Sequence, residues 1–295
     1  MTTVKPMTFL TNCGEVMIAD RTQAADEIDD DREAVDAVLG HVARYRLSTF
    51  AAMSQLSEFS DKSPRQLRRL LRDCRDARLL SSAALHSGMR YWFLTLDGAA
   101  RCGLDESRSG PLSETAKLRA YAMLLFCCLS ASPRCRLTAN ELKKRFSVLH
   151  RPGMPGTYYF DPTGTGCIGL ARIDSGHHGR WDRVVQSVKE DISLHTKLTG
   201  FRQLIAAHRF EITVLTVLPV KAERTASVLK SLPEVKHVPV HVVAQPELLP
   251  LLCSSPGKED IQNDNKRLPH HWFHRSRPRS KEKQRAVNLS HRRQN

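Results

Sequence analysis

The sequence predicts an α+β protein, and three observations lead to this fold class. Helical spacing of apolar residues dominates up to about residue 156, strand and helix patterns alternate from about residue 157, and the chain turns polar and basic at Ser254. Strands alternating with helices are typical of a sheet covered by helices. The predicted order is a flexible acidic arm (1–31), a helical domain with a hairpin (32–104), a linker with helices (105–156), a small α/β domain (157–253) and a disordered basic tail (254–295).

The composition favours a polyanionic partner. The 295 residues include 45 lysines and arginines against 31 aspartates and glutamates, which gives a net charge of +14. Contacts of lysine and arginine with phosphates release counterions, so this excess favours binding to nucleic acid. The charge alone does not separate DNA, RNA and an anionic membrane surface.

We expect neither a membrane span nor a metal centre. The most apolar stretch, 121–129, is far shorter than the roughly 18 residues that cross a bilayer, and the first residues lack the pattern of a signal peptide. The 8 cysteines include no Cys-x-x-Cys pair, so the sequence predicts no zinc ribbon and no cysteine metal ligands. We therefore expect a cytoplasmic protein with no membrane partner.

Three helices are predicted in the N-terminal domain. Apolar residues at i, i+3, i+4 and i+7 predict a helix over about 33–45, and Ser48 suits the N-cap of a second helix. The third helix opens with Ser63-Pro64-Arg65-Gln66. Ser63 and Gln66 can form a capping box there, and Pro64 suits the first helical position.

The third helix carries a row of arginines opposite its apolar stripe. These residues are Arg65, Arg68, Arg69 and Arg72. Two short apolar-rich runs, 79–85 and 89–95, follow and predict a β-hairpin. A capped helix with a basic outer face followed by a hairpin is the order of a recognition helix and its wing. We therefore predict a winged helix-turn-helix whose four arginines, with Arg90 of the wing, contact double-stranded DNA. The alternative is a merely solvated arginine face.

The remaining chain predicts further helices and then a sheet. Thr95 suits the cap of a short helix, an apolar helix with one buried face is expected over about 114–130, and Thr138 and Glu141 form a capping box. Strands are expected over 158–160, 167–173, 210–217 and 238–243, with helices over about 181–208 and 221–231. Pro239 places the last strand at an edge of the sheet.

One motif after the hairpin carries a family resemblance. It reads Phe93-Leu94-Thr95-Leu96-Asp97-Gly98-Ala99. A winged helix that ends in such a motif and is followed by an α/β domain resembles the replication-relaxation family of mobile elements and the related MobC-type relaxases. The resemblance covers roughly residues 33–250. It implies that the second domain is restriction-endonuclease-like, with a site of the pattern Asp…Glu-x-Lys.

The resemblance implies three candidate catalytic residues. In such a site an aspartate and a glutamate hold a divalent metal, and a lysine orients the attacking group. Asp161 stands where the aspartate is expected, but Arg172-Ile173-Asp174 stands where Glu-x-Lys belongs, so the motif is degenerate. Asp174 and Lys189 are the residues that could replace the missing ligand and the missing lysine, with Lys197 as the alternative lysine.

The expected function is that of a DNA-binding accessory or regulatory protein of a plasmid or other mobile element, in mobilisation, replication control or transcription. This role needs no cofactor, and it implies a homodimer or mobilisation and replication proteins as partners. One alternative is a metal-dependent DNA-nicking enzyme, a relaxase or nuclease, that uses Asp161 and Asp174 with Mg²⁺ or Mn²⁺. A protein-interaction adaptor is the third hypothesis, and it leaves the arginine row without a role.

Overall fold

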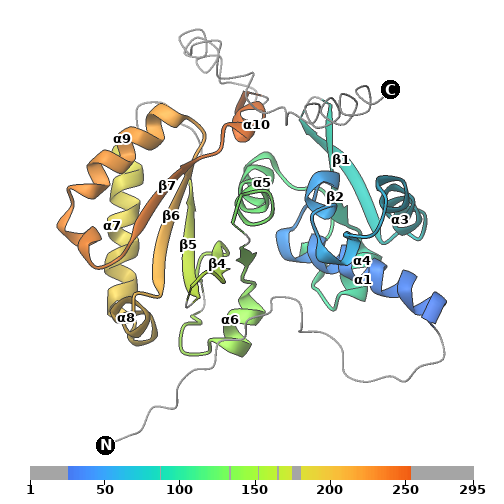
Figure 1. The fold of residues 1–295 in the computed structure, drawn as a ribbon, viewed down its shortest axis with the longest axis horizontal. Coiled ribbons are helices and arrows are strands. Elements are labelled where there is room, and N and C mark those ends of the chain that lie inside the picture. The colour runs from blue at the N-terminus through green and yellow to red at the C-terminus, as the bar shows by residue number, and fades with distance from the viewer. Residues whose placement is uncertain are drawn as a thin grey trace, which may run out of the picture. The chain divides into compact units, whose positions relative to one another are not determined.

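The computed structural model describes residues 26–86, 88–132, 134–151, 153–164, 166–174 and 181–253 (Figure 1). The predicted arm up to residue 25 and the predicted basic tail from residue 254 lie outside the described residues. Helices and strands alternate through the described chain in the mixed arrangement expected of an α+β protein.

The N-terminal part consists of helices and one hairpin. Its elements are α1 (Asp26–Tyr45), α2 (Phe50–Met53), the short 3-10 helix η1 (Ser57–Phe59), α3 (Pro64–Asp76), β1 (Leu80–His86), β2 (Met89–Leu94) and α4 (Leu96–Arg101). Helix α1 begins at Asp26 and not near residue 33 as predicted. Residues 26–31 of the predicted arm therefore belong to this helix.

Ser48 has a different role from the predicted one. Thr49 caps α2, because its hydroxyl accepts a hydrogen bond from the backbone N–H of Ala52. The backbone of Ser48 pairs with that of Trp92 through two hydrogen bonds of 3.0 and 2.8 Å. This bridge adds a third short extended segment beside the antiparallel hairpin of β1 and β2.

Five strands form one mixed sheet. They are β3 (Cys135–Arg136), β4 (Tyr158–Asp161), β5 (Cys167–Ile173), β6 (Phe210–Thr216) and β7 (Val240–Ala244), and they neighbour one another in that order. Strand β4 is antiparallel to both β3 and β5, whereas β5, β6 and β7 run parallel. The predicted edge position of the last strand is confirmed, as is the buried strand that precedes it.

Helices cover both faces of this sheet (Figure 1). On one face lie α7 (Trp181–Lys197), α8 (Thr199–Ala206) and α9 (Pro219–Lys230), and Tyr158 packs there against the Phe201 ring. Helix α5 (Glu114–Cys128) lies on the other face, where the ring of Phe126 packs edge-on against that of Tyr159 at 4.9 Å. Neighbouring residues of β4 therefore point to opposite faces, as strand geometry requires.

Shorter helices complete the structure. These are η2 (Glu106–Arg108), α6 (Ala139–Arg145), η3 (Pro233–Lys236), η4 (Pro246–Leu248) and α10 (Leu249–Cys253). The predicted Thr138–Glu141 capping box opens α6. The predicted long helix over 181–208 breaks at Leu198, and Gly200 lies inside α8. A Cβ on Gly200 would come within 2.8 Å of the Val148 carbonyl oxygen, so a close approach of backbone requires this glycine.

Helix α5 is buried nearly all round, contrary to the prediction of one buried face. Ten of its residues are buried, namely Lys117, Leu118, Ala120, Tyr121, Ala122, Met123, Leu124, Leu125, Phe126 and Cys127. It contacts α1 and α2 of the N-terminal part as well as β3 and β5 of the sheet. A helix that is apolar on every side is buried on every side, and here two parts of the chain share it.

Candidate nucleic-acid interface

The arginine row of α3 is exposed. The predicted capping box is present, with the Ser63 hydroxyl 3.3 Å from the Gln66 backbone nitrogen and the Gln66 Oε1 2.7 Å from the Ser63 nitrogen. The apolar stripe of the helix packs inward through Leu67, Leu70, Leu71 and Cys74. Helical geometry then directs Arg65, Arg68, Arg69 and Arg72 outward, and all four are exposed.

These four arginines make few contacts within the chain. The guanidinium of Arg68 lies 4.8 Å from the centre of the Phe50 ring. Arg69 lies 3.8 Å from Asp73 one turn away, and both side chains are more than half exposed, so this pair stabilises little. Arg65 and Arg72 have no ion-pair partner among the described residues. The row is thus free to exchange water for phosphate oxygens.

Arg90 lies on the hairpin, as predicted, but its side chain has partners there. Its Nη2 donates to the carbonyl oxygen and the hydroxyl of Ser82 on the opposite strand, each at 3.1 Å. The residue is exposed at the end of the hairpin, and a guanidinium has five donors. Further donors of Arg90 therefore stay available to a ligand.

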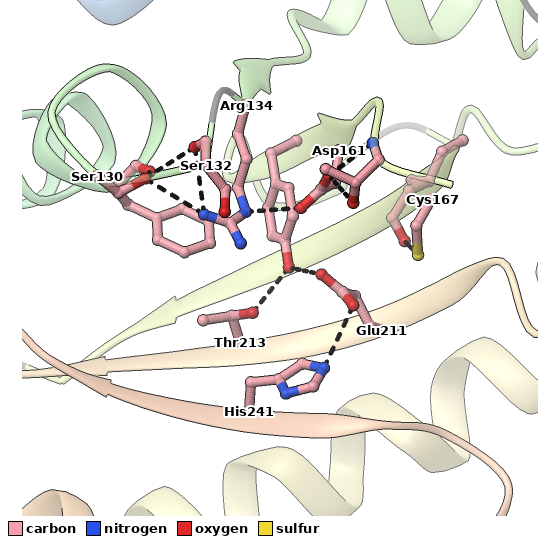
Figure 2. Close-up of polar contacts among 12 residues, drawn as sticks. Ser130, Ser132, Arg134, Asp161, Cys167, Glu211, Thr213 and His241 are labelled. Atoms are coloured by element: carbon pink, nitrogen blue, oxygen red, sulfur yellow. Dashed lines mark hydrogen bonds and ion pairs between the residues drawn. The ribbon is translucent and has the colours of Figure 1, made fainter. Parts of the chain in front are cut away.

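Asp161 lies in a polar cluster on the α5 face of the sheet (Figure 2). It is 6% exposed, and one of its oxygens lies 2.9 Å from Nε of Arg134, which follows α5. Its other oxygen accepts hydrogen bonds from the backbone and the hydroxyl of Thr163, at 2.9 and 2.6 Å. Both oxygens are thus engaged in holding the turn after β4.

The cluster continues across the sheet through Tyr159, Glu211 and His241. The Tyr159 hydroxyl donates to Glu211 at 2.5 Å and lies 2.7 Å from the Thr213 hydroxyl, while His241 lies 3.3 Å from the other Glu211 oxygen (Figure 2). The hydrogen bond to Glu211 raises the pKa of His241. Burial favours the protonated form of Glu211, but its hydrogen bonds from His241 and Tyr159 outweigh this and lower its pKa.

Asp174 lies at the opposite end of β5 from Asp161. Asp161 pairs with Cys167, where β5 begins, and Asp174 follows Ile173, where β5 ends. At about 3.3 Å per residue the two carboxylates are about 23 Å apart along the strand. A metal ligand oxygen lies only about 2 to 2.6 Å from the ion, so Asp161 and Asp174 cannot hold one metal. The predicted joint site is therefore wrong.

Asp174 has its own partners. Nζ of Lys221 lies 2.7 Å from one of its oxygens, and the Thr216 hydroxyl donates to the same oxygen at 3.1 Å. Both members of the ion pair are about nine-tenths buried. Asp174 thus ties the end of β5 to β6 and to the first turn of α9.

Lys189 is also not placed for the predicted role. It lies in α7, on the face of the sheet opposite Asp161, and its Nζ is 3.7 Å from a carboxylate oxygen of Glu234. The residue at the position expected for glutamate, Arg172, pairs with Asp191 of α7. The predicted catalytic set of Asp161, Asp174 and Lys189 is therefore not assembled.

The polar cluster contains residues that the sequence analysis did not single out. Glu211 and Thr213 alternate with apolar residues in β6, and His241 interrupts a run of valines in β7. Polar residues at every second position mark one face of a strand. That signal could have placed Glu211 and Thr213 together, but only the sheet order brings them to Tyr159.

Among the described residues, no three or more histidine, cysteine, aspartate or glutamate side chains gather in a group that could hold a metal ion. The seven cysteines in the described ranges are free thiols. Within the same ranges no helix is both long enough and apolar enough to cross a membrane.

Comparison of the chain with protein-family models, with curated proteins and with solved structures finds no match.

Proposed function

We propose that this protein is a DNA-binding accessory or regulatory protein, in which residues 32–104 are a winged helix-turn-helix. Helix α3 is the recognition helix, and the β1–β2 hairpin is the wing. The observation that carries the proposal is the exposed row of four arginines on a capped, well-packed helix that leads directly into a hairpin. Arginine is the residue that most often contacts guanine edges and phosphates.

Two further features support this assignment. The bridge between Ser48 and Trp92 ties the segment before α2 to the hairpin, which fixes the hairpin beside the helices. The ion pair of Arg69 with Asp73 is long and exposed, so a phosphate can replace the aspartate at little energetic cost.

The second part of the proposal concerns the sheet and the source of the protein. A mixed sheet with helices on both faces is compatible with the restriction-endonuclease-like domain that the resemblance implies. The same resemblance supports a role in mobilisation, replication control or transcription of a plasmid or other mobile element. With Asp161 and Asp174 at opposite ends of β5, we propose that the sheet has a binding or supporting role.

The test replaces the arginine row by glutamine, which removes the positive charges but is also a good helix former. Arg65, Arg68, Arg69 and Arg72 are all changed to glutamine, and binding to duplex DNA is measured by fluorescence anisotropy across a salt series. The slope of log affinity against log salt decreases by about 0.9 for each phosphate that a variant no longer neutralises. We expect weaker binding and a clearly smaller slope for the variant.

A matched control removes four exposed cations elsewhere, through Arg183→Gln, Arg224→Gln, Lys230→Gln and Lys236→Gln. The two variants have the same net charge, so equal binding by both would contradict the proposed interface. Gel retardation of supercoiled DNA with Mg²⁺ or Mn²⁺ is scored in parallel for nicking. We expect retardation without nicking, and Asp161→Asn, which keeps an oxygen to accept the hydrogen bonds from Thr163, should leave retardation unchanged.

A further inference from the structure

A second basic surface lies at the amino ends of the parallel strands. It consists of Lys143, Lys144, Arg145, Arg151, Lys197 and Arg202, which we call the α6–α8 surface. All six residues are exposed. None of their side chains has an ion-pair partner among the described residues. The surface therefore presents six uncompensated positive charges to solvent.

The elements that carry these charges pack against one another. Residues Val148 and Leu149, which follow α6, contact Gly200 of α8 closely enough that a Cβ there would clash with both. Leu149 is buried in the same core as Phe201. Figure 1 shows α6 and α8 at the same end of the sheet. The six cations thus belong to one region of the fold.

The carboxylate of α6 is already engaged. Glu141 pairs with Arg44 at 2.7 Å. It is therefore not available to neutralise the α6–α8 surface. The excess positive charge therefore has to be balanced by ions from solution or by a bound polyanion.

Helix stability accounts for only part of this arrangement. Lys143, Lys144 and Arg145 fall in the last turn of α6, where a cation is favourable near the negative end of the helix dipole. Arg202 lies in the first half of α8, where the dipole disfavours a cation, and Arg151 lies outside any helix. These two arginines have no structural role that the dipole or an ion pair explains.

We propose that the α6–α8 surface is a second phosphate-binding surface, which contacts the backbone of duplex DNA. The inference rests on the proposed function and deepens it, because it makes α3 the reader of the DNA and this surface an additional contact. Flexible lysines act as point charges towards phosphates and do not read bases. Contacts here increase affinity without sequence preference and weaken with salt.

The test uses the full chain and the triple variant Lys143→Gln, Lys144→Gln, Arg145→Gln. Binding to a duplex is measured by anisotropy over a salt series, with single-stranded DNA and anionic vesicles as parallel probes. We expect the slope of log affinity against log salt to fall by about one for each phosphate that these side chains neutralise in the wild-type complex. The charge-matched control is Arg224→Gln, Lys230→Gln, Lys236→Gln, which should keep the wild-type slope.

Equal slopes for the triple variant and its control would overturn the second surface while leaving the α3 proposal intact. A triple variant that loses vesicle binding but keeps duplex binding would also overturn it, in favour of a membrane surface. The converse result, a slope that responds to the α6 charges but not to the α3 arginines, would keep this surface and reject α3 as the reader. A wild-type chain that binds no DNA would reject both.

Discussion

At the scale of single residues, Gly169 permits the polar cluster to form. It faces Tyr159 across β4 and β5, and Glu211 across β5 and β6. The Tyr159 ring lies over Gly169, so a Cβ at this position would stand 1.9 Å from the ring carbon that bears the hydroxyl. Only a glycine lets the tyrosine reach across one strand to Glu211 and Thr213 on the next.

Gly169→Ala is therefore expected to destabilise the fold. The new methyl group displaces Tyr159 and breaks its buried hydrogen bonds, and overpacking and a broken hydrogen bond together cost about 2 to 4 kcal/mol. Urea unfolding monitored by circular dichroism measures the change. Gly40→Ala is the control, because nothing lies within 4 Å of a Cβ there and α1 gains a better helix former. Similar stability of the two variants would show that the ring moves freely.

His41 predicts a dependence of stability on pH. Burial, reinforced by the charge of Arg44, lowers the pKa of this histidine from 6.5 to about 4, and its Nε2 has no hydrogen-bond partner among the described residues. Between these two pH values the unfolded chain binds a proton that the folded chain excludes. The free energy of unfolding therefore falls as the pH drops from 6.5 towards 4.

We expect the wild-type chain to lose about 2 to 3 kcal/mol more than His41→Phe between pH 7 and pH 4.5. Urea unfolding at both pH values measures this difference, and the variant cancels the contributions of other titrating groups. The same loss of stability in both proteins would mean that His41 takes up a proton as readily in the folded chain as in the unfolded chain.

At the scale of elements, three of the predicted helix caps are confirmed. The caps at Ser63, Thr95 and Thr138 all open helices, because a cap acts within one turn and depends on few residues. The break between α7 and α8 lies at Leu198, two residues before Gly200, where a break was predicted. The hairpin strands and β4 to β7 also fell where apolar and β-branched runs predicted them, whereas the two-residue strand β3 was not predicted.

The sequence was a poor guide where distant elements decide the outcome. The spacing of apolar residues assigned α5 one buried face, because periodicity does not show that two separate parts of the chain pack on the same helix. Asp161 ends β4 and Asp174 follows β5, and the sequence suggested that both could hold one metal. Their separation depends on β4 and β5 being antiparallel, which places the two strand ends at opposite edges of the sheet.

At the scale of the whole described molecule, Arg44 and Glu141 link the N-terminal part to the sheet. Arg44 at the end of α1 donates two hydrogen bonds to Glu141, at 2.7 and 3.2 Å, and one to the Arg136 carbonyl oxygen. Glu141 also accepts from the backbone of Thr138 as part of the α6 cap. One carboxylate thus serves both a helix start and the contact between the two parts.

Glu141→Gln is expected to lower the free energy of unfolding by about 1 to 3 kcal/mol, because a hydrogen-bonded charge loses its partner. Trp92 of the hairpin and Trp181 of α7 report separately when each is kept as the sole tryptophan. We expect both probes to shift to lower urea concentration together. A shift of one probe alone would show that the two parts unfold independently. The control is Asp76→Asn, which removes the charge of a carboxylate in an exposed ion pair with Arg75.

The burial of α5 has a practical and an evolutionary consequence. Because this helix supplies core residues to both parts, cutting the chain before or after it would leave one fragment with an exposed face of α5 and the other with the uncovered apolar surface on which α5 packs. Either fragment would tend to self-associate. The N-terminal part that carries α3 therefore cannot be exchanged between proteins as an independent domain. Any recombination that replaced it would have to replace α5 as well.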